Sequence, residues 1–115
     1  MSKTMCIDFD GTISEYEGRE PGPPKPGVRK ALRKFKKQGY IICVYTCRTN
    51  LVLRETPIAC MDEVRMIEKY MNRHSIPFDL VLNNQKPIAD IYIDNRAIGY
   101  RDNWDKVVKE VENGW

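Results

Sequence analysis

Short apolar segments alternate with helix-like segments along the whole chain. The apolar segments cover residues 4–9, 40–46, 79–82 and 90–93. They are continuously apolar, rather than apolar at every second position, which is typical of parallel strands covered on both faces. We therefore predict four buried strands of one parallel sheet.

Three further segments repeat apolar residues at helical spacing. The stripes are Val28, Ala31, Leu32 and Phe35; Met61, Val64, Ile67 and Met71; and Trp104, Val107, Val108 and Val111. A proline-rich segment precedes the first helix, and Gly39 and Gly114 provide stops after the first and third. Apolar stripes of this kind normally face a core, so we expect all three helices to pack against the sheet.

Strand and helix alternation over 115 residues predicts one α/β domain spanning residues 1–115. The expected architecture is a Rossmann-like three-layer sandwich, with a four-stranded parallel sheet in the order 3-2-1-4 and right-handed crossovers. Active sites in such folds form at the carboxyl ends of the strands. The polar residues that follow the strands are therefore the candidates for chemistry.

The composition is that of an ordinary globular protein, with 42% hydrophobic and 30% charged residues. No apolar run approaches the roughly 20 residues that a membrane helix needs. The first residues lead into an apolar run without a small-residue cleavage site, so no signal peptide is predicted. The cysteines at 6, 43, 47 and 60 form no CxxC pair and are expected to be reduced thiols. These features together favour a cytoplasmic protein without a membrane partner.

The net charge of +3 is unevenly distributed along the chain. No acidic residue occurs between Pro21 and Arg54, while nine lysines and arginines do. A solvated outer helix face is the ordinary explanation for such a run. Attraction of an anionic substrate or of nucleic acid is the alternative.

Acidic residues follow two of the predicted strands. Asp8 and Asp10 end the first strand and Asp94 ends the fourth, while Thr46 ends the second and Lys86 precedes the fourth. Carboxylates without histidine or cysteine suit Mg²⁺, a hard cation that keeps several waters. A lysine and a threonine hydroxyl beside them suit the charged oxygens of a phosphoryl group.

This ordered set resembles the motifs of the haloacid dehalogenase (HAD) superfamily of phosphotransferases. The run Asp-Phe-Asp-Gly-Thr at 8–12 is similar to the first motif of that superfamily, DxDGT after an apolar strand. Thr46 resembles the second motif and Lys86 the third. Asp94 and Asn95 resemble the fourth, which usually carries two acids. The motifs extend over nearly the whole chain.

The resemblance implies a role for each matching residue. Asp8 would be the nucleophile that becomes an aspartyl-phosphate, and Asp10 the general acid and base. Thr46 and Lys86 would bind the phosphoryl oxygens. Mg²⁺ would be held by the Asp8 carboxylate, the backbone carbonyl of Asp10 and Asp94.

Supporting roles follow for four more residues. Gly11 would permit the tight turn and Thr12 would brace it. Asn95 replaces an acid by an amide, which can orient a metal-bound water but adds no negative charge. Arg48, two residues beyond Thr46, is the best candidate for a second contact with an anionic substrate.

No cap domain fits in this chain. Residues 13–26 provide only a short flap, and residues 47–78 a loop and one helix. An open site must take a phosphoryl group on a large substrate, or be covered by another subunit, if water is to be excluded. The favoured function is a Mg²⁺-dependent phosphomonoester hydrolase, acting on a phosphorylated small molecule or macromolecule, with a homo-oligomer left open.

Three alternatives compete with this interpretation. The basic stretch suggests, as one alternative, an enzyme similar to polynucleotide 3′-phosphatases, which acts on nucleic-acid ends. Oligonucleotide binding that weakens with added salt would support this alternative. A receiver-like signalling module also holds a phospho-aspartate, but its acceptor lies on the third strand, where this chain has Leu82 and Asn83. A catalytically silent binding domain is the third alternative.

Overall fold

The computed structural model describes residues 3–17, 20–46, 57–82 and 88–114. In chain order the elements are β1 (Thr4–Asp8), β2 (Ser14–Glu17), β3 (Glu20–Pro24), α1 (Val28–Lys37), β4 (Ile41–Tyr45), α2 (Pro57–Arg73), β5 (Leu80–Val81), β6 (Ile91–Ile93) and α3 (Trp104–Glu112). The four predicted strands are all present, each one or two residues shorter than the apolar run that predicts it.

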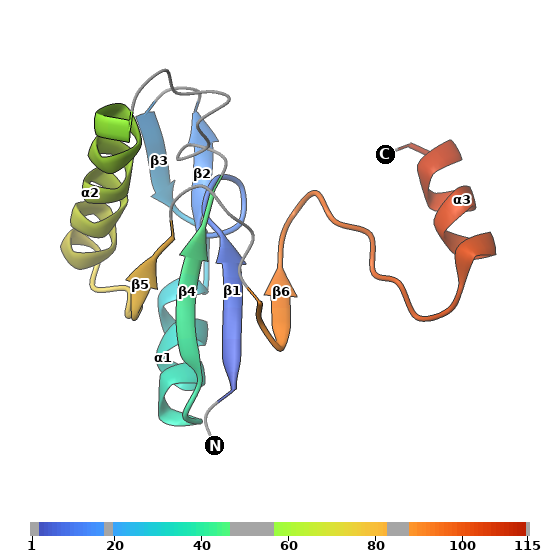
Figure 1. The fold of residues 1–115 in the computed structure, drawn as a ribbon, viewed down its shortest axis with the longest axis horizontal. Coiled ribbons are helices and arrows are strands. Elements are labelled where there is room, and N and C mark those ends of the chain that lie inside the picture. The colour runs from blue at the N-terminus through green and yellow to red at the C-terminus, as the bar shows by residue number, and fades with distance from the viewer. Residues whose placement is uncertain (1–2, 18–19, 47–56, 83–87, 115) are drawn as a thin grey trace.

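The main sheet has four parallel strands in the order β5-β4-β1-β6 (Figure 1). Numbered along the chain without the β2–β3 hairpin, this is the predicted order 3-2-1-4. Asp8 lies opposite Tyr45 of β4, and Ile7 lies opposite Ile93 of β6. The predicted α/β class, with a Rossmann-like parallel sheet, is therefore confirmed, and β1 occupies a central position with a neighbour on each side.

One face of this sheet packs against α1 and α2. Its central residues are Met5 and Ile7 of β1 and Ile42 and Val44 of β4. The helices contribute Val28, Leu32, Ile67, Tyr70 and Met71 to the same buried cluster. The apolar stripe of α1 thus faces the core as predicted, and so does the stripe of α2 apart from Met61, which is exposed.

Asp79 joins α1, β4 and the start of β5. Its Oδ2 accepts a hydrogen bond of 2.7 Å from Lys36 Nζ and one of 2.6 Å from the backbone N–H of Ile42. Partial burial acts to raise the pKa of Asp79, but these bonds to the ionised form outweigh it and lower the pKa below its usual value. The charged carboxylate therefore stabilises the junction of the three elements.

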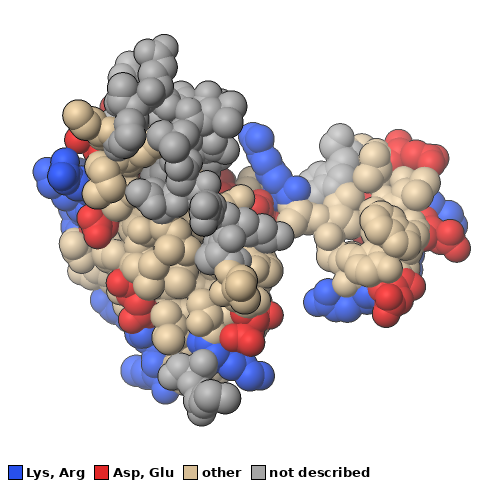
Figure 2. Space-filling model, viewed as in Figure 1, with Lys and Arg blue, Asp and Glu red and all other residues tan. Residues whose placement is uncertain are grey.

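The third helix does not pack as expected. It stands apart from the sheet (Figure 1), and none of its residues is buried. Trp104 is 66% exposed and Val111 53%, and uncharged surface lies open in the middle of α3 with charged side chains around it (Figure 2). The expectation that all three stripes face the core is wrong for α3, because periodicity fixes which residues share a face but not what covers that face.

A second element departs from the prediction. The segments Ser14–Glu17 and Glu20–Pro24, expected only as part of a flap, pair as the antiparallel strands β2 and β3. The hydroxyl of Tyr70 on α2 donates a 2.7 Å hydrogen bond to the backbone carbonyl of Gly22 and so ties the hairpin to the core.

Two further expectations concern cysteines and membrane helices. Cys6, Cys43 and Cys60 are buried and form no disulfide within the described residues, as expected for reduced thiols, while Cys47 lies outside those residues. Within the described ranges, every helix is too short or too polar to cross a membrane.

Candidate active site

The loop after β1 is organised by one backbone carbonyl. The oxygen of Phe9 accepts hydrogen bonds from the N–H groups of Thr12 (3.3 Å), Ile13 (2.9 Å) and Ser14 (3.1 Å). Asp8 ends the strand immediately before this turn, and Asp10 lies within it. The turn therefore holds the two acids of the first motif at the carboxyl end of a central strand.

Phe9 and Ile13 anchor the loop in the core. Both side chains are fully buried, and the Phe9 ring meets the ring of Tyr70 edge-on with centroids 5.1 Å apart. Successive side chains of an extended chain point to opposite sides. Because Phe9 points into the core, its sequence neighbours Asp8 and Asp10 point the other way, and both are partly accessible at the edge of the sheet.

Thr12 connects this loop to the end of β6. Its Oγ1 lies 3.3 Å from Asp8 Oδ2 and 3.3 Å from Asn95 Oδ1, so its single hydrogen is shared between two acceptors. The same oxygen accepts a 3.1 Å hydrogen bond from the backbone N–H of Asn95. Thr12 thus bridges two segments that are 83 residues apart in sequence.

Gly11 fits where a side chain cannot. Its φ of 82° lies in the left-handed region, and its N–H donates a 2.8 Å hydrogen bond to the carbonyl of Ser14. A Cβ at this position would lie 2.5 Å from Asn95 Nδ2, well inside van der Waals contact. The left-handed backbone therefore favours glycine at position 11, and a side chain there would also have to displace the amide end of Asn95.

Burial and the negative charges nearby both disfavour ionisation of Asp8. Burial raises the pKa of Asp8 to about 7, the charges of Asp94 and Asp10 add to the effect, and the hydrogen bond from Thr12 opposes it. Asp94 itself accepts a 2.7 Å hydrogen bond from the backbone N–H of Arg96. Ionising Asp8 thus costs free energy in the protein alone, and a cation beside these acids would offset that cost.

The remaining predicted residues belong to two groups. Thr46 is described: it follows β4 directly, is 4% exposed, and adjoins Tyr45, whose carbonyl accepts a 3.1 Å hydrogen bond from the N–H of Phe9. Thr46 therefore lies at the same sheet edge as Asp8. Arg48 and Lys86 lie outside the described residues.

The candidate site offers oxygen atoms as the donors for a metal ion. No group of three or more His, Cys, Asp or Glu side chains that could hold a metal occurs among the described residues. The set expected for Mg²⁺ needs only two carboxylates, from Asp8 and Asp94, with the backbone carbonyl of Asp10. These donors are all oxygen and carry two negative charges, which fits a hard cation that completes its shell with water.

Asp90 and Tyr70 lie outside the candidate site but hold elements around it in place. Asp90 accepts a 2.8 Å hydrogen bond from the backbone N–H of Thr4, at the start of β1, so it lies at the opposite edge of the sheet from Asp8. Tyr70 holds both Phe9 and Gly22 and was not singled out from the sequence. A tyrosine directly before Met71 on an apolar helix face was the available signal, because a buried tyrosine usually finds a partner for its hydroxyl.

Comparison with known proteins supports the fold alone. No protein-family model matches the chain, and no curated protein matches it. A conserved protein of known structure from Bacteroides thetaiotaomicron is similar, with 20% identity and a TM-score of 0.64, over 100% of this chain and 93% of that one. A structural-genomics target from Vibrio cholerae is 22% identical with a TM-score of 0.61, over 96% of this chain and 98% of that one. The α/β fold is thus shared along nearly the full length of both proteins.

Proposed function

We propose that this protein is a Mg²⁺-dependent phosphomonoester hydrolase of the HAD type, working through an aspartyl-phosphate on Asp8. The observation that carries the proposal is the placement of Asp8. It lies half-buried at the carboxyl end of β1, within the electrostatic influence of Asp94 and Asp10 and beside the Thr12 hydroxyl. A carboxylate in such surroundings is suited to attack on phosphorus once a cation offsets the negative charge.

In the first step, an oxygen of Asp8 attacks the phosphorus in line with the leaving group. The new Asp8–phosphorus bond forms while the bond from phosphorus to the leaving oxygen breaks. Asp10, in the turn two residues further on, gives its proton to that leaving oxygen, and the alcohol departs. Asp8 then carries the phosphoryl group.

In the second step, water replaces Asp8. Asp10 now takes a proton from the water, whose oxygen attacks the phosphorus, and the bond to Asp8 breaks to release inorganic phosphate. Asp8 returns as a carboxylate, held by Thr12, and Asn95 keeps Thr12 in position through its backbone N–H. The net reaction is one phosphomonoester plus water giving one alcohol and phosphate.

Phosphate binding is assigned to Thr46, Lys86 and Arg48 by residue type. Mg²⁺, when bound by Asp8, Asp94 and the Asp10 carbonyl, supplies positive charge that lowers the repulsion between two anions. Without a cap, exclusion of water requires a large substrate or a second copy of the chain over the site. A cytoplasmic phosphorylated molecule, small or macromolecular, is the substrate class we propose.

The proposal is tested by Asp8→Asn with p-nitrophenyl phosphate and Mg²⁺. The variant should lose activity, and Asp10→Asn should lose about 10²- to 10⁴-fold, the usual contribution of a positioned general acid and base. Asp90→Asn is the matched control, because it changes an acid at the opposite edge of the same sheet. Undiminished activity of Asp8→Asn would refute the mechanism, and an equal loss in Asp90→Asn would assign the effect to folding.

A further inference from the structure

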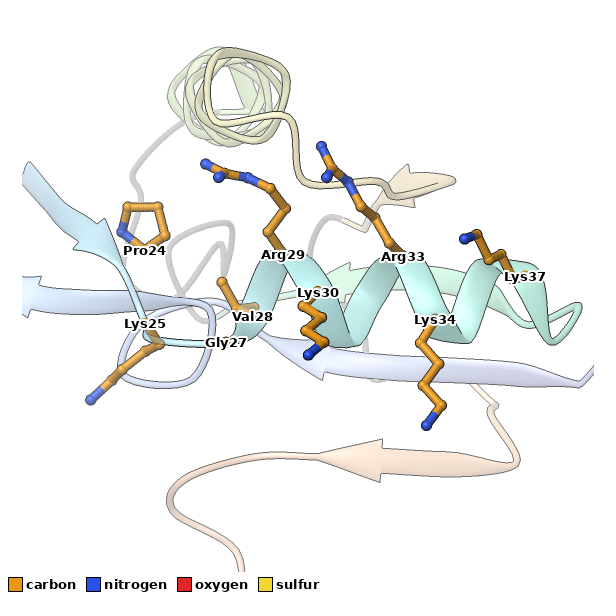
Figure 3. Close-up of a pocket in the computed structure, with 9 residues that line it drawn as sticks. All are labelled: Pro24, Lys25, Gly27, Val28, Arg29, Lys30, Arg33, Lys34 and Lys37. Carbon is orange, nitrogen blue, oxygen red and sulfur yellow. The ribbon is translucent and has the colours of Figure 1, made fainter.

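A groove of about 730 Å³ runs along the outer face of α1, on the side away from the sheet (Figure 3). Its lining includes six basic residues: Lys25, Arg29, Lys30, Arg33, Lys34 and Lys37. In Figure 3, Lys25, Lys30 and Lys34 project to one side of the helix, and Arg29, Arg33 and Lys37 to the other. We call this face the basic surface of α1.

Three of these side chains have contacts that explain them within the fold. Arg29 Nε donates a 2.7 Å hydrogen bond to the carbonyl of His74, and Arg33 Nη2 lies 3.4 Å from the carbonyl of Ser75. Both carbonyls directly follow α2, where the backbone carries partial negative charge. Lys25 Nζ lies 3.2 Å from a carboxylate oxygen of Glu15.

Lys34 and Lys37 lie in the last turn of α1, where the helix dipole favours positive charge, whereas Lys30 has no such explanation. All three are exposed, and no acidic side chain of the described residues pairs with them. Lys30 lies in the first turn of α1, where the helix dipole disfavours a positive charge. Lys30 and Lys34 also repel one another, since like charges four residues apart cost about 0.2–0.5 kcal/mol. The fold therefore leaves Lys30 unexplained, and the ammonium groups of all three exposed lysines are open to an anionic ligand.

We propose that the basic surface of α1 binds the phosphodiester backbone of a nucleic acid. A row of phosphates requires positive charge along a line, and neutralising phosphates releases condensed counterions. Lys30 to Lys37 cover about 10 Å of helix, at 1.5 Å per residue. Two phosphate steps of an extended strand span a similar length.

The lining composition separates nucleic acid from other polyanions. A helix that binds a lipid surface inserts apolar side chains, but the apolar stripe of α1 is already committed to the core. A protein interface normally has apolar or aromatic residues at its centre, whereas the groove lining includes no aromatic residue. Without aromatic rings for base stacking, binding should depend on charge and tolerate any sequence.

The surface lies beside the candidate active site but is independent of it. The backbone N–H of Lys25 donates a 2.8 Å hydrogen bond to the carbonyl of Ile13, so the groove begins next to the loop that carries Asp10. Binding of nucleic acid to this face goes beyond phosphate hydrolysis and does not require it. The Asp8→Asn variant should therefore bind DNA as the unmodified protein does, within twofold.

The test is fluorescence anisotropy of the full chain with a labelled single-stranded DNA of about 20 nucleotides. Three neutralised phosphates of a single strand predict a roughly 20-fold loss of affinity between about 50 and 200 mM salt. The combined variant Lys30→Gln, Lys34→Gln, Lys37→Gln should bind at least about 10-fold more weakly at low salt, with a shallower salt dependence.

A matched variant controls for net charge. Replacing Lys69, Lys106 and Lys109 by Gln also removes three charges from the net +3, leaving 0, but on other helices. It should keep more of the affinity than the α1 variant, and both should melt near the unmodified protein. Equal losses in the two variants, or no binding at low salt, would overturn the proposal. Binding to phosphatidylserine vesicles or to poly-glutamate as tight as to DNA would overturn the assignment to nucleic acid.

Discussion

The helices α2 and α3 carry the same kind of apolar stripe but meet different surroundings. Ile67 and Met71 of α2 are fully buried against the sheet, whereas Val108 of α3 is 49% exposed. A helix of 9 residues is too short to be stable in water without a packing partner. An apolar stripe therefore predicts which face of a helix would be buried. Whether that face packs against the sheet depends on where the connecting segments place the helix.

The largest expected effect lies in α2. Ile67→Ala removes a fully buried side chain between α2 and the sheet and should lower the free energy of unfolding by about 2–5 kcal/mol. Urea denaturation followed by circular dichroism measures this directly. A loss below 1 kcal/mol would contradict the assignment of α2 to the core.

The second largest effect is expected at Gly11, in the loop after β1, where Asn95 approaches from the segment that leads from β6 toward α3. Gly11→Ala should cost about 1–2 kcal/mol for the left-handed backbone, plus a smaller cost for moving the amide end of Asn95, whose Nδ2 would lie 2.5 Å from the new Cβ. Gly27→Ala is the matched control: its φ is 83°, but a Cβ there meets nothing within 4 Å. The loss of stability in Gly11→Ala beyond that in Gly27→Ala measures the contact with Asn95. Equal losses in the two variants would contradict a close contact between Gly11 and Asn95.

The ion pair of Asp79 should give a smaller and pH-dependent effect. Asp79→Asn should lower the free energy of unfolding near pH 7 by about 1 kcal/mol, because bonds to a charged carboxylate are weakened. The folded-state pKa of Asp79 lies below its usual value, so the stabilisation is present above about pH 4 and is lost as the pH falls through the folded pKa. Unfolding curves at several pH values test this: the two proteins should converge in acid. A difference that grows in acid would contradict it.

The smallest effect is expected in α3. Val108→Ala should change the free energy of unfolding by less than about 0.5 kcal/mol, because the side chain is already half exposed. A loss near 2 kcal/mol would instead mean that the stripe of α3 is covered in solution. Repeating the measurement at several protein concentrations would then separate covering by the same chain from covering by a second copy.

The features predicted well from the sequence are those set by local pattern. The parallel strands follow from continuous apolar runs, and the neighbouring acids Asp8 and Asp10 follow from their place at a strand end. The hairpin was missed because β3 contains Pro21, Pro23 and Pro24, and proline is uncommon within strands. The link from Thr12 to Asn95 could not be derived from spacing, since it depends on how β6 reaches β1 across most of the chain.

The position of β1 in the sheet has a consequence for biosynthesis. Its residues leave the ribosome before those of β4 and β6, yet Met5 pairs with Ile42 of β4 and with Ile91 of β6. At the usual rate of about 5–20 residues per second, β1 waits several seconds for its second neighbour. Pairings so distant in sequence also close slowly. The loop after β1 therefore gains its hydrogen bonds to Asn95 late, when β1 and β4 can already pair.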